Sequence, residues 1–384
     1  MATADAVVAA FGDGSLRFFD ASGPSEAIDA HAGVVLCLAA QGSSVISGGD
    51  DGRLIRTSRD GSVEELAAYG SRWVDCVAAT DERVVCSSGR NTYLWRAGQD
   101  KPTVFEHNST VGGLAFDGKG KRLAVGHYGG ATVWERGAKR WVSTKLHWKG
   151  SHGAVSFSPD NRFLISTMQE NAVHGWRLRD KCQLAMPGYP AKIKSFAWVG
   201  TTPHLATSGA DEAICWPFDG KDGPMERKPL SVAPGGQQLA TCVEGLPLID
   251  ALFVGFQDGA VILAELDEGK DINVIRGSKG DEVTAIRVCP EHSHVLIGDA
   301  AGRVLWAKMW AAESRESTVS QRGPSRRHGT AGFVSAPGSR SSGRSCSPRR
   351  CRRHHSSTAD QRVRPACNRS SADTGHTRTC LLRS

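Results

Sequence analysis

The chain has 384 residues, 47 of them basic and 40 acidic, and its formal net charge of +7 is divided unevenly between two regions. Residues 311–384 contain 15 Arg and no Lys and have a net charge of +11, which leaves a net charge of −4 for residues 1–310. No apolar run approaches the ~18 residues of a membrane span, and the first residues lack the basic region and apolar stretch of a signal peptide. Composition therefore predicts a soluble, cytoplasmic protein.

Cysteine usage agrees with that compartment. The chain has 11 Cys, and those within residues 1–310 lie in apolar stretches without paired spacing. This arrangement predicts reduced, buried thiols rather than disulfides.

Residues 1–310 repeat a short unit that ends in an aromatic-rich strand. The repeated strands are expected at residues 14–20, 52–57, 93–96, 132–135, 173–177, 214–217, 259–264 and 302–307. Equivalent positions in successive strands are 38 to 48 residues apart. A period near ~40 residues with four short strands per unit is typical of a β-propeller.

The order of elements inside a unit is constant. In the fourth unit, an apolar strand at residues 111–116, a polar turn and a second strand at 122–126 precede the aromatic strand. Pairs such as Asp51-Gly52 supply the positive φ angles that tight hairpins require. The pattern predicts an all-β fold of four-stranded antiparallel blades.

The pattern resembles that of the WD40 repeat family, whose motif is an Asp-Gly turn followed by a strand that ends in Trp-Asp. Residues 13–20 match the motif best, with Phe19 in the place of Trp. Other units have the Trp, at Trp95, Trp134, Trp176 and Trp216, and a single His stands for the family's Gly-His at His31, His107 and His152. Residues 168–178 and 206–225 are similar to segments of small bacterial WD40 proteins with no established activity.

The number of blades depends on the first unit. Eight aromatic-strand hairpins occur, but the one at residues 6–20 begins at its second strand. We therefore expect eight blades over residues 1–310, the first without its innermost strand. Seven blades with a loose N-terminus is the alternative.

The resemblance implies that a partner binds one rim of the propeller, formed by the loops that enter the inner strands and by the turns before the aromatic strands. Aromatic and Arg side chains there would supply most of the binding energy. The candidate partner-binding residues are Arg72, Trp73, His127, Tyr128, Trp148, Lys149, His152, Met168, Glu170, Tyr189, Lys192 and Asp211. For Trp73 and Trp148, the alternative is a structural role as wedges between blades.

Motifs for catalysis or metal binding are missing from the sequence. It has no Gly-x-Ser-x-Gly elbow, Gly-rich phosphate loop or His-Glu-x-x-His motif. Residues 289–294 contain a thiol and two imidazoles, but they fall on a turn without a second cluster at zinc-finger spacing. We predict no cofactor, no metal and no enzyme activity. The alternative is a propeller hydrolase or lyase in which His127, Glu170 and Asp211 converge on the central axis.

The segment 311–384 contains only Phe333 of the 26 aromatic residues and is rich in Arg and Ser. Arg pairs such as Arg352-Arg353 would bind RNA electrostatically. The lack of Lys, against 14 Lys in residues 1–310, resembles a GC-rich gene read in the wrong frame. We favour this frameshift interpretation and expect a disordered tail in either case.

These observations predict a non-enzymatic protein-protein interaction scaffold whose rim binds an unidentified protein partner. Residues 1–310 have a net negative charge and are therefore not expected to bind nucleic acid. Similarity to bacterial propellers encoded beside metal-chaperone GTPases implies a partner in metal homeostasis. RNA binding through the tail and an axial enzyme site are the alternatives.

Overall fold

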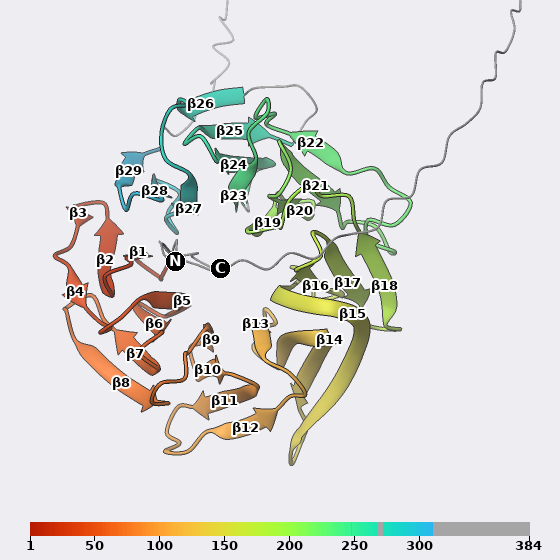
Figure 1. Ribbon diagram of the computed structural model, residues 1–384. Coiled ribbons are helices and arrows are strands. Elements are labelled where there is room, and N and C mark those ends of the chain that lie inside the picture. Colours follow the sequence, from red (N-terminus) through yellow and green to blue (C-terminus); the bar gives the residue numbers. More distant parts are fainter. Residues whose placement is uncertain (247, 267–271, 310–384) are drawn as a thin grey trace, which may run out of the picture. The chain divides into compact units, whose positions relative to one another are not determined.

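The computed structural model describes residues 1–246, 248–266 and 272–309. These residues form 29 β-strands and no helix, and the strands build a ring of small antiparallel sheets around a central axis (Figure 1). The predicted all-β propeller is therefore confirmed. Within the described part of the chain, no helix has the length and apolar character needed to cross a membrane. The predictions for residues 311–384 lie outside the described residues.

Each sheet is built from strands that are consecutive in the chain. The first three sheets contain β1 (Val7–Ala10), β2 (Ser15–Asp20), β3 (Gly23–Pro24) and β4 (Ile28–Asp29); β5 (Val35–Gln41), β6 (Ser44–Gly49), β7 (Arg53–Thr57) and β8 (Val63–Ala68); and β9 (Cys76–Thr80), β10 (Arg83–Ser88), β11 (Asn91–Arg96) and β12 (Thr103–Glu106). The fourth sheet contains β13 (Val111–Phe116), β14 (Arg122–Arg136), β15 (Trp141–Phe157), β16 (Phe163–Met168), β17 (Val173–Arg177) and β18 (Cys182–Met186). The last three contain β19 (Phe196–Val199), β20 (His204–Thr207), β21 (Ala213–Pro217) and β22 (Leu230–Val232); β23 (Ala240–Leu246), β24 (Ala251–Phe256), β25 (Val261–Glu265) and β26 (Ile272–Arg276); and β27 (Val283–Val288), β28 (His294–Asp299) and β29 (Val304–Lys308).

The second sheet shows how a unit folds. Its second strand, β6, is almost entirely buried, whereas the outermost strand, β8, is mostly exposed. The turn from β6 to β7 requires Gly52, because its φ is +77° and a Cβ there would lie 2.1 Å from the carbonyl oxygen of Gly70. Asp51 fixes the same turn, because its Oδ1 accepts the Arg53 backbone N–H at 3.1 Å, an ordinary hydrogen-bond distance. Its Oδ1 also lies 3.0 Å from Nδ1 of His31.

The fourth sheet changes the number of blades. The first part of β15 pairs with β14 and its last part pairs with β16, so two repeat units share one sheet of six strands. Counted as hydrogen-bonded sheets, the described residues therefore form seven blades. Counted in this way, the alternative prediction of seven blades is observed. The six-stranded sheet holds the strands of two repeat units, so all eight predicted units are present. The strand β15 runs without a break through Gly150, whose φ is +114°, and changes its pairing partner there from β14 to β16.

The ring closes by packing of the first sheet against the last. The Trp306 indole N–H donates to the carbonyl oxygen of Asp20 at 2.9 Å, and the rings of Phe19 and Trp306 are 5.8 Å apart. The innermost strand predicted to be missing from the first unit is partly present. Ala2 forms a bridge with Val7 along the inner edge of β1.

The core consists of apolar clusters, several of which fill the space between neighbouring sheets. Among the described residues, every cysteine is a free thiol, and all are buried except Cys182. The prediction of buried thiols is therefore wrong for Cys182, because it lies on an exposed outer strand where no sheet covers it. Burial raises the pKa of the Cys86 and Cys215 thiols to about 12, so both are protonated and act as apolar core groups.

Candidate functional site

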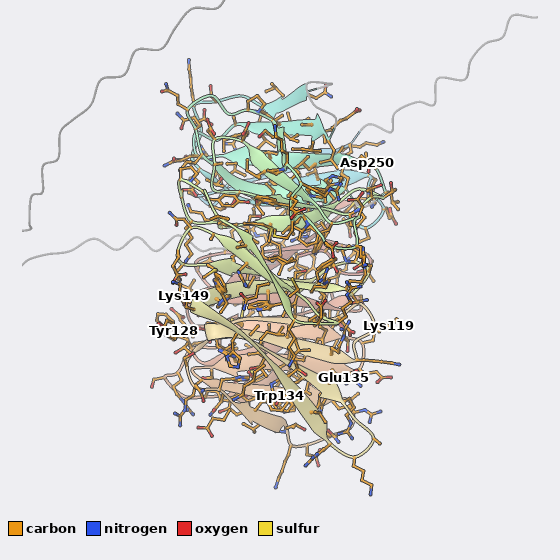
Figure 2. All side chains as sticks on the ribbon, turned by 90° about the vertical axis from the view of Figure 1, so that its right-hand side faces the viewer. Lys119, Tyr128, Trp134, Glu135, Lys149 and Asp250 are labelled. Carbon is orange, nitrogen blue, oxygen red and sulfur yellow. The ribbon has the colours of Figure 1, made fainter. Side chains whose placement is uncertain are left out.

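The two faces of the ring carry different turns. Because neighbouring strands are antiparallel, the loops that enter the inner strands lie on the same face as the turns before each third strand. Tyr128 and Lys149, one from each kind of turn, lie on this face, whereas Lys119 and Asp250 lie on the opposite face (Figure 2). We call the first face the rim face.

Five of the candidate residues line one groove of about 390 Å³ on the rim face, which we call the rim groove. They are Tyr128, Trp148, Lys149, Met168 and Glu170. The first comes from the turn within β14, the next two from the middle of β15, and the last two from the end of β16 and the turn after it. The groove thus brings together segments from both repeat units of the six-stranded sheet.

One wall of the rim groove is an aromatic stack. The rings of Trp148 and His174 are nearly parallel, with centroids 4.1 Å apart. His152 is buried behind them, with Nδ1 2.7 Å from Oγ of Ser166 and Nε2 3.2 Å from the carbonyl oxygen of Trp148. Trp148 is half-buried, so it combines the wedge role with exposure toward the groove.

The floor of the groove depends on Gly150. A Cβ at this position would lie 2.7 Å from Cε of Met168 and 2.8 Å from Oε1 of Glu170, and its φ is +114°. The neighbouring Ser151 N–H donates to the same carboxylate oxygen at 3.1 Å. Glycine is therefore required for this close approach, and the hydrogen bond locks the turn after β16 against β15.

Tyr128 stands at the outer lip of the groove and is 66% exposed. Its backbone is held firmly, because its N–H donates to Oγ of Ser109 at 2.9 Å. His127 braces the same turn, with Nε2 2.9 Å from Oγ1 of Thr132 and Nδ1 2.9 Å from the carbonyl oxygen of Tyr128. A fixed backbone with an exposed ring limits the entropy lost when the ring binds a partner.

Four other candidates lie on the rim face outside the groove. Arg72 and Trp73 come from the loop that enters β9, and Trp73 is 45% exposed. Lys192 is half-buried in the loop that enters β19, and Asp211 is exposed in the turn before β21. They share the face with the groove but do not line it.

Tyr189 differs from the exposed rim side chain that was expected. It is 8% exposed, and its hydroxyl lies 2.6 Å from Oγ1 of Thr207 while accepting the indole N–H of Trp216 at 2.7 Å. Burial raises its pKa to about 12. Its ring therefore belongs to the core, where its hydroxyl is paired with Thr207 and Trp216.

Six further residues complete the rim groove, and the sequence did not predict them. They are Ala172, Val173, His174, Ala185, Met186 and Pro187. Most of these belong to β17 and β18, which read as ordinary strands and not as rim loops. The apolar Met186 followed by Pro187 was the only sequence signal, since it marks an outer strand that ends beside a loop.

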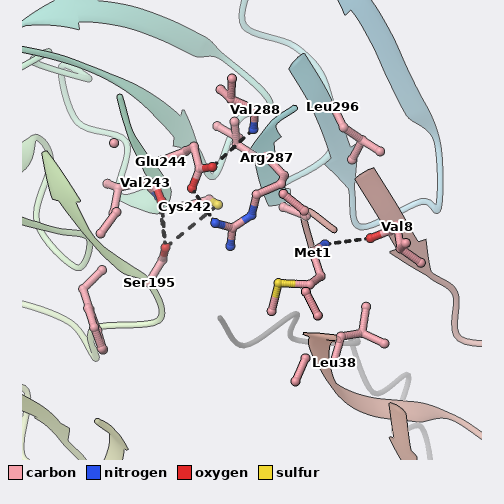
Figure 3. A pocket seen from close by; sticks show the side chains of 18 of the residues that line it. Met1, Val8, Leu38, Ser195, Cys242, Val243, Glu244, Arg287, Val288 and Leu296 are labelled. Carbon is pink, nitrogen blue, oxygen red and sulfur yellow. Dashed lines mark hydrogen bonds and ion pairs between the residues drawn. The ribbon is translucent and has the colours of Figure 1, made fainter. Parts of the chain in front are cut away.

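The central axis holds a second cavity, of about 660 Å³, lined mainly by inner strands (Figure 3). Nη1 of Arg287 lies 3.0 Å from Oε2 of Glu244, whose other oxygen accepts the Val288 N–H at 3.2 Å. Ser195 exchanges hydrogen bonds with the backbone of Val243. Burial raises the pKa of the nearby Cys242 thiol to about 11, so this thiol is protonated at neutral pH.

The three residues proposed for an axial enzyme site do not meet there. Glu170 lines the rim groove, His127 braces the turn beside it, and Asp211 lies elsewhere on the rim face. None of them lines the axial cavity as formed by the described residues. The convergence required by the enzyme alternative is therefore not observed.

The turn at residues 289–294 uses its thiol to shape the backbone. The Cys289 sulfur accepts the backbone N–H groups of Ser293 and His294 at 3.2 and 3.1 Å. The His294 ring stacks on Trp306 with centroids 5.0 Å apart. Over the residues described by the structure, no group of three His, Cys, Asp or Glu residues is arranged to hold a metal ion.

Comparison with known proteins identifies the class. The computationally designed Ika8 protein has a TM-score of 0.63 and 19% identity, with 79% of this chain and 93% of that chain covered. The WD40 repeats of RRP9 have a TM-score of 0.54 and 17% identity, covering 78% of this chain and 91% of theirs, and U3-55K has 0.51 and 18%, covering 69% and 88%. The chain therefore has the fold of a WD40 repeat β-propeller.

A relative by sequence is transcription initiation factor TFIID subunit 5 of Caenorhabditis elegans. It is 23% identical over 183 residues, which are 45% of this chain, and the match spans 27% of the relative's length. No protein-family model matches the chain.

Proposed function

We propose that this protein is a non-enzymatic interaction scaffold that binds a protein partner through the rim face of its propeller. The observation that carries the proposal is the rim groove, where five candidates chosen from the sequence line one apolar depression with an exposed tyrosine at its lip. Aromatic side chains at the edge of such a depression are typical anchors of protein interfaces.

Fold similarity supports a scaffold without defining its partner. Proteins with this fold include the WD40 repeats of RRP9, and propellers of this class generally serve protein-protein interaction. The axial cavity gives less support to an enzyme, because its carboxylate is paired with Arg287 and its Ser195 hydroxyl is bound to backbone.

The test is a quantitative binding series with a partner identified by affinity capture on the full chain and then purified. Trp73→Ala and Tyr128→Ala are expected to raise the partner's Kd by about tenfold or more, because exposed aromatic residues on a binding face carry much of the energy. Isothermal titration calorimetry of both variants and the parent protein measures this change.

Lys119→Ala is the matched control, since Lys119 lies on the opposite face (Figure 2). Its Kd is expected to equal that of the parent protein. Weakened binding by Lys119→Ala, with both rim variants unaffected, would assign the partner to the other face and refute the proposal.

A further inference from the structure

We propose that the rim groove receives a short segment of the partner in which a large apolar side chain is followed or preceded by a carboxylate. This inference rests on the proposed scaffold function and names the chemistry that the rim face recognises.

The floor accepts an apolar side chain. Val173, Met168 and Met186 line it and are 1%, 5% and 0% exposed, so their surfaces are fixed by the core beneath them. The thioether groups are polarisable and make favourable contacts with aromatic and other apolar side chains. A volume of about 390 Å³ lies at the low end for binding pockets, which suits a side-chain anchor and not a bulky domain surface.

The aromatic residues define the sides of this anchor site. Trp148 is held in place by its stack on His174, and Tyr128 is exposed on a braced turn. Burial lowers the pKa of His174 to about 3, so the imidazole is neutral and adds no charge to the groove. An apolar anchor between preorganised aromatic walls loses little free energy to ordering of the site.

Charge at the mouth selects the residue beside the anchor. Lys149 and Glu170 are the charged residues among those that line the groove. Glu170 is exposed and keeps its negative charge, but the Ser151 N–H fixes its carboxylate against β15. Lys149 is exposed and forms no ion pair with any described residue. The mobile Lys149 ammonium is therefore the charge that can reach toward a partner, and a carboxylate is its complement.

Access comes from the outer edge of the sheet. Ala185 and Pro187, at the end of the outermost strand β18, line the groove and are exposed. A segment of a partner can thus enter without displacing any strand. The small side chain at Ala185 leaves room that a larger residue would fill.

The experiment is a selection of random peptides displayed on phage against the immobilised full-length protein, followed by Kd measurement of the most enriched peptide by fluorescence anisotropy. Enriched peptides are expected to combine Leu, Met, Phe or Trp with a neighbouring Asp or Glu. Lys149→Gln should weaken the peptide by about tenfold, and Ala185→Trp should abolish binding by filling the groove.

Glu170→Gln and Lys119→Gln are the matched variants. Removing the negative charge at Glu170 is expected to leave the acidic peptide's Kd unchanged or to lower it, and Lys119→Gln on the opposite face is expected to have no effect. Circular dichroism of each variant checks that the fold is intact.

Three results would overturn the inference. Enrichment of basic peptides that Glu170→Gln weakens would reverse the assigned charge. Peptides insensitive to Ala185→Trp but lost in Trp73→Ala would place binding elsewhere on the rim face and leave the scaffold function standing. Absence of any enriched peptide, with an intact partner complex that Trp73→Ala still weakens, would also reject the groove and not the scaffold.

Discussion

The indole of Trp148 stacks on the imidazole of His174 with the ring planes 13° apart and the centroids separated by 4.1 Å. One face of the indole is thereby committed to the fold, while the residue still lines the rim groove. Tyr128, at the opposite lip, has no comparable ring contact among the described residues and is 66% exposed. The two aromatic residues should therefore respond differently to truncation.

Trp148→Ala is expected to lower the free energy of unfolding by about 2 kcal/mol, because it removes a half-buried ring and its stack. Tyr128→Ala should change it by less than about 0.5 kcal/mol, as is usual for exposed positions. Urea unfolding of the two variants measures the difference. Equal losses in both variants would contradict the assignment of Tyr128 to the surface.

The turn that carries Tyr128 contains two glycines, Gly129 and Gly130, which differ in how much space a side chain would have. At Gly130, φ is +137° and a Cβ would lie 1.9 Å from the carbonyl oxygen of Leu146, which is fixed backbone. Gly130→Ala should therefore destabilise by about 3 kcal/mol or more. Gly129→Ala, at φ +87° with open space around it, should cost about 1 kcal/mol from backbone strain alone. Thermal unfolding of both variants tests this order, and a larger shift at Gly129 would refute it.

Thr57 occupies the position where other units have Trp, and its buried hydroxyl has no hydrogen-bond partner among the described residues. Thr57→Val keeps the shape and removes the unpaired group, so it should stabilise the protein by about 1 kcal/mol. Thr241→Val is the matched control, because the Thr241 hydroxyl donates to the Val283 carbonyl oxygen at 2.7 Å. This second change should destabilise by a similar amount in chemical denaturation. A loss of stability in both variants would show that Thr57 is satisfied.

Acid should destabilise the propeller before its carboxylates are protonated. Burial lowers the pKa of His107 to about 4 and of His174 to about 3, from an ordinary value of 6.5. As pH decreases, these histidines are therefore protonated in the unfolded chain at a higher pH than in the folded protein. The free energy of unfolding then falls below pH 6.5, by up to about 1.4 kcal/mol per pH unit for each histidine. Urea titrations at pH 7.5, 6.0 and 5.0 measure this slope.

His174→Gln is the control for that titration, since glutamine does not ionise in this range. The variant should have a shallower dependence on pH between 6.5 and 5 than the parent protein. A free energy of unfolding that stays constant over this interval in the parent protein would contradict the burial of neutral imidazoles.

Local sequence determined the strands and the rim because both depend on neighbouring residues. Alternating apolar residues and turns such as Asp51-Gly52 specify a hairpin wherever they occur, and the period of these hairpins specifies the propeller. Tyr128 and Lys149 lie on the same face, because turn type and strand order decide on which face a loop lies.

Tertiary structure alone decided which residues meet. The strand β15 pairs with β14 before Gly150 and with β16 after it, so two repeat units that are separate in the sequence share one six-stranded sheet. Tyr189 packs in a core cluster, where its hydroxyl pairs with Thr207 and Trp216 of later strands. Met186 lines the rim groove although it belongs to an outer strand. The groove forms between strands that the packing of the whole ring brings together, and no local sequence pattern encodes that packing.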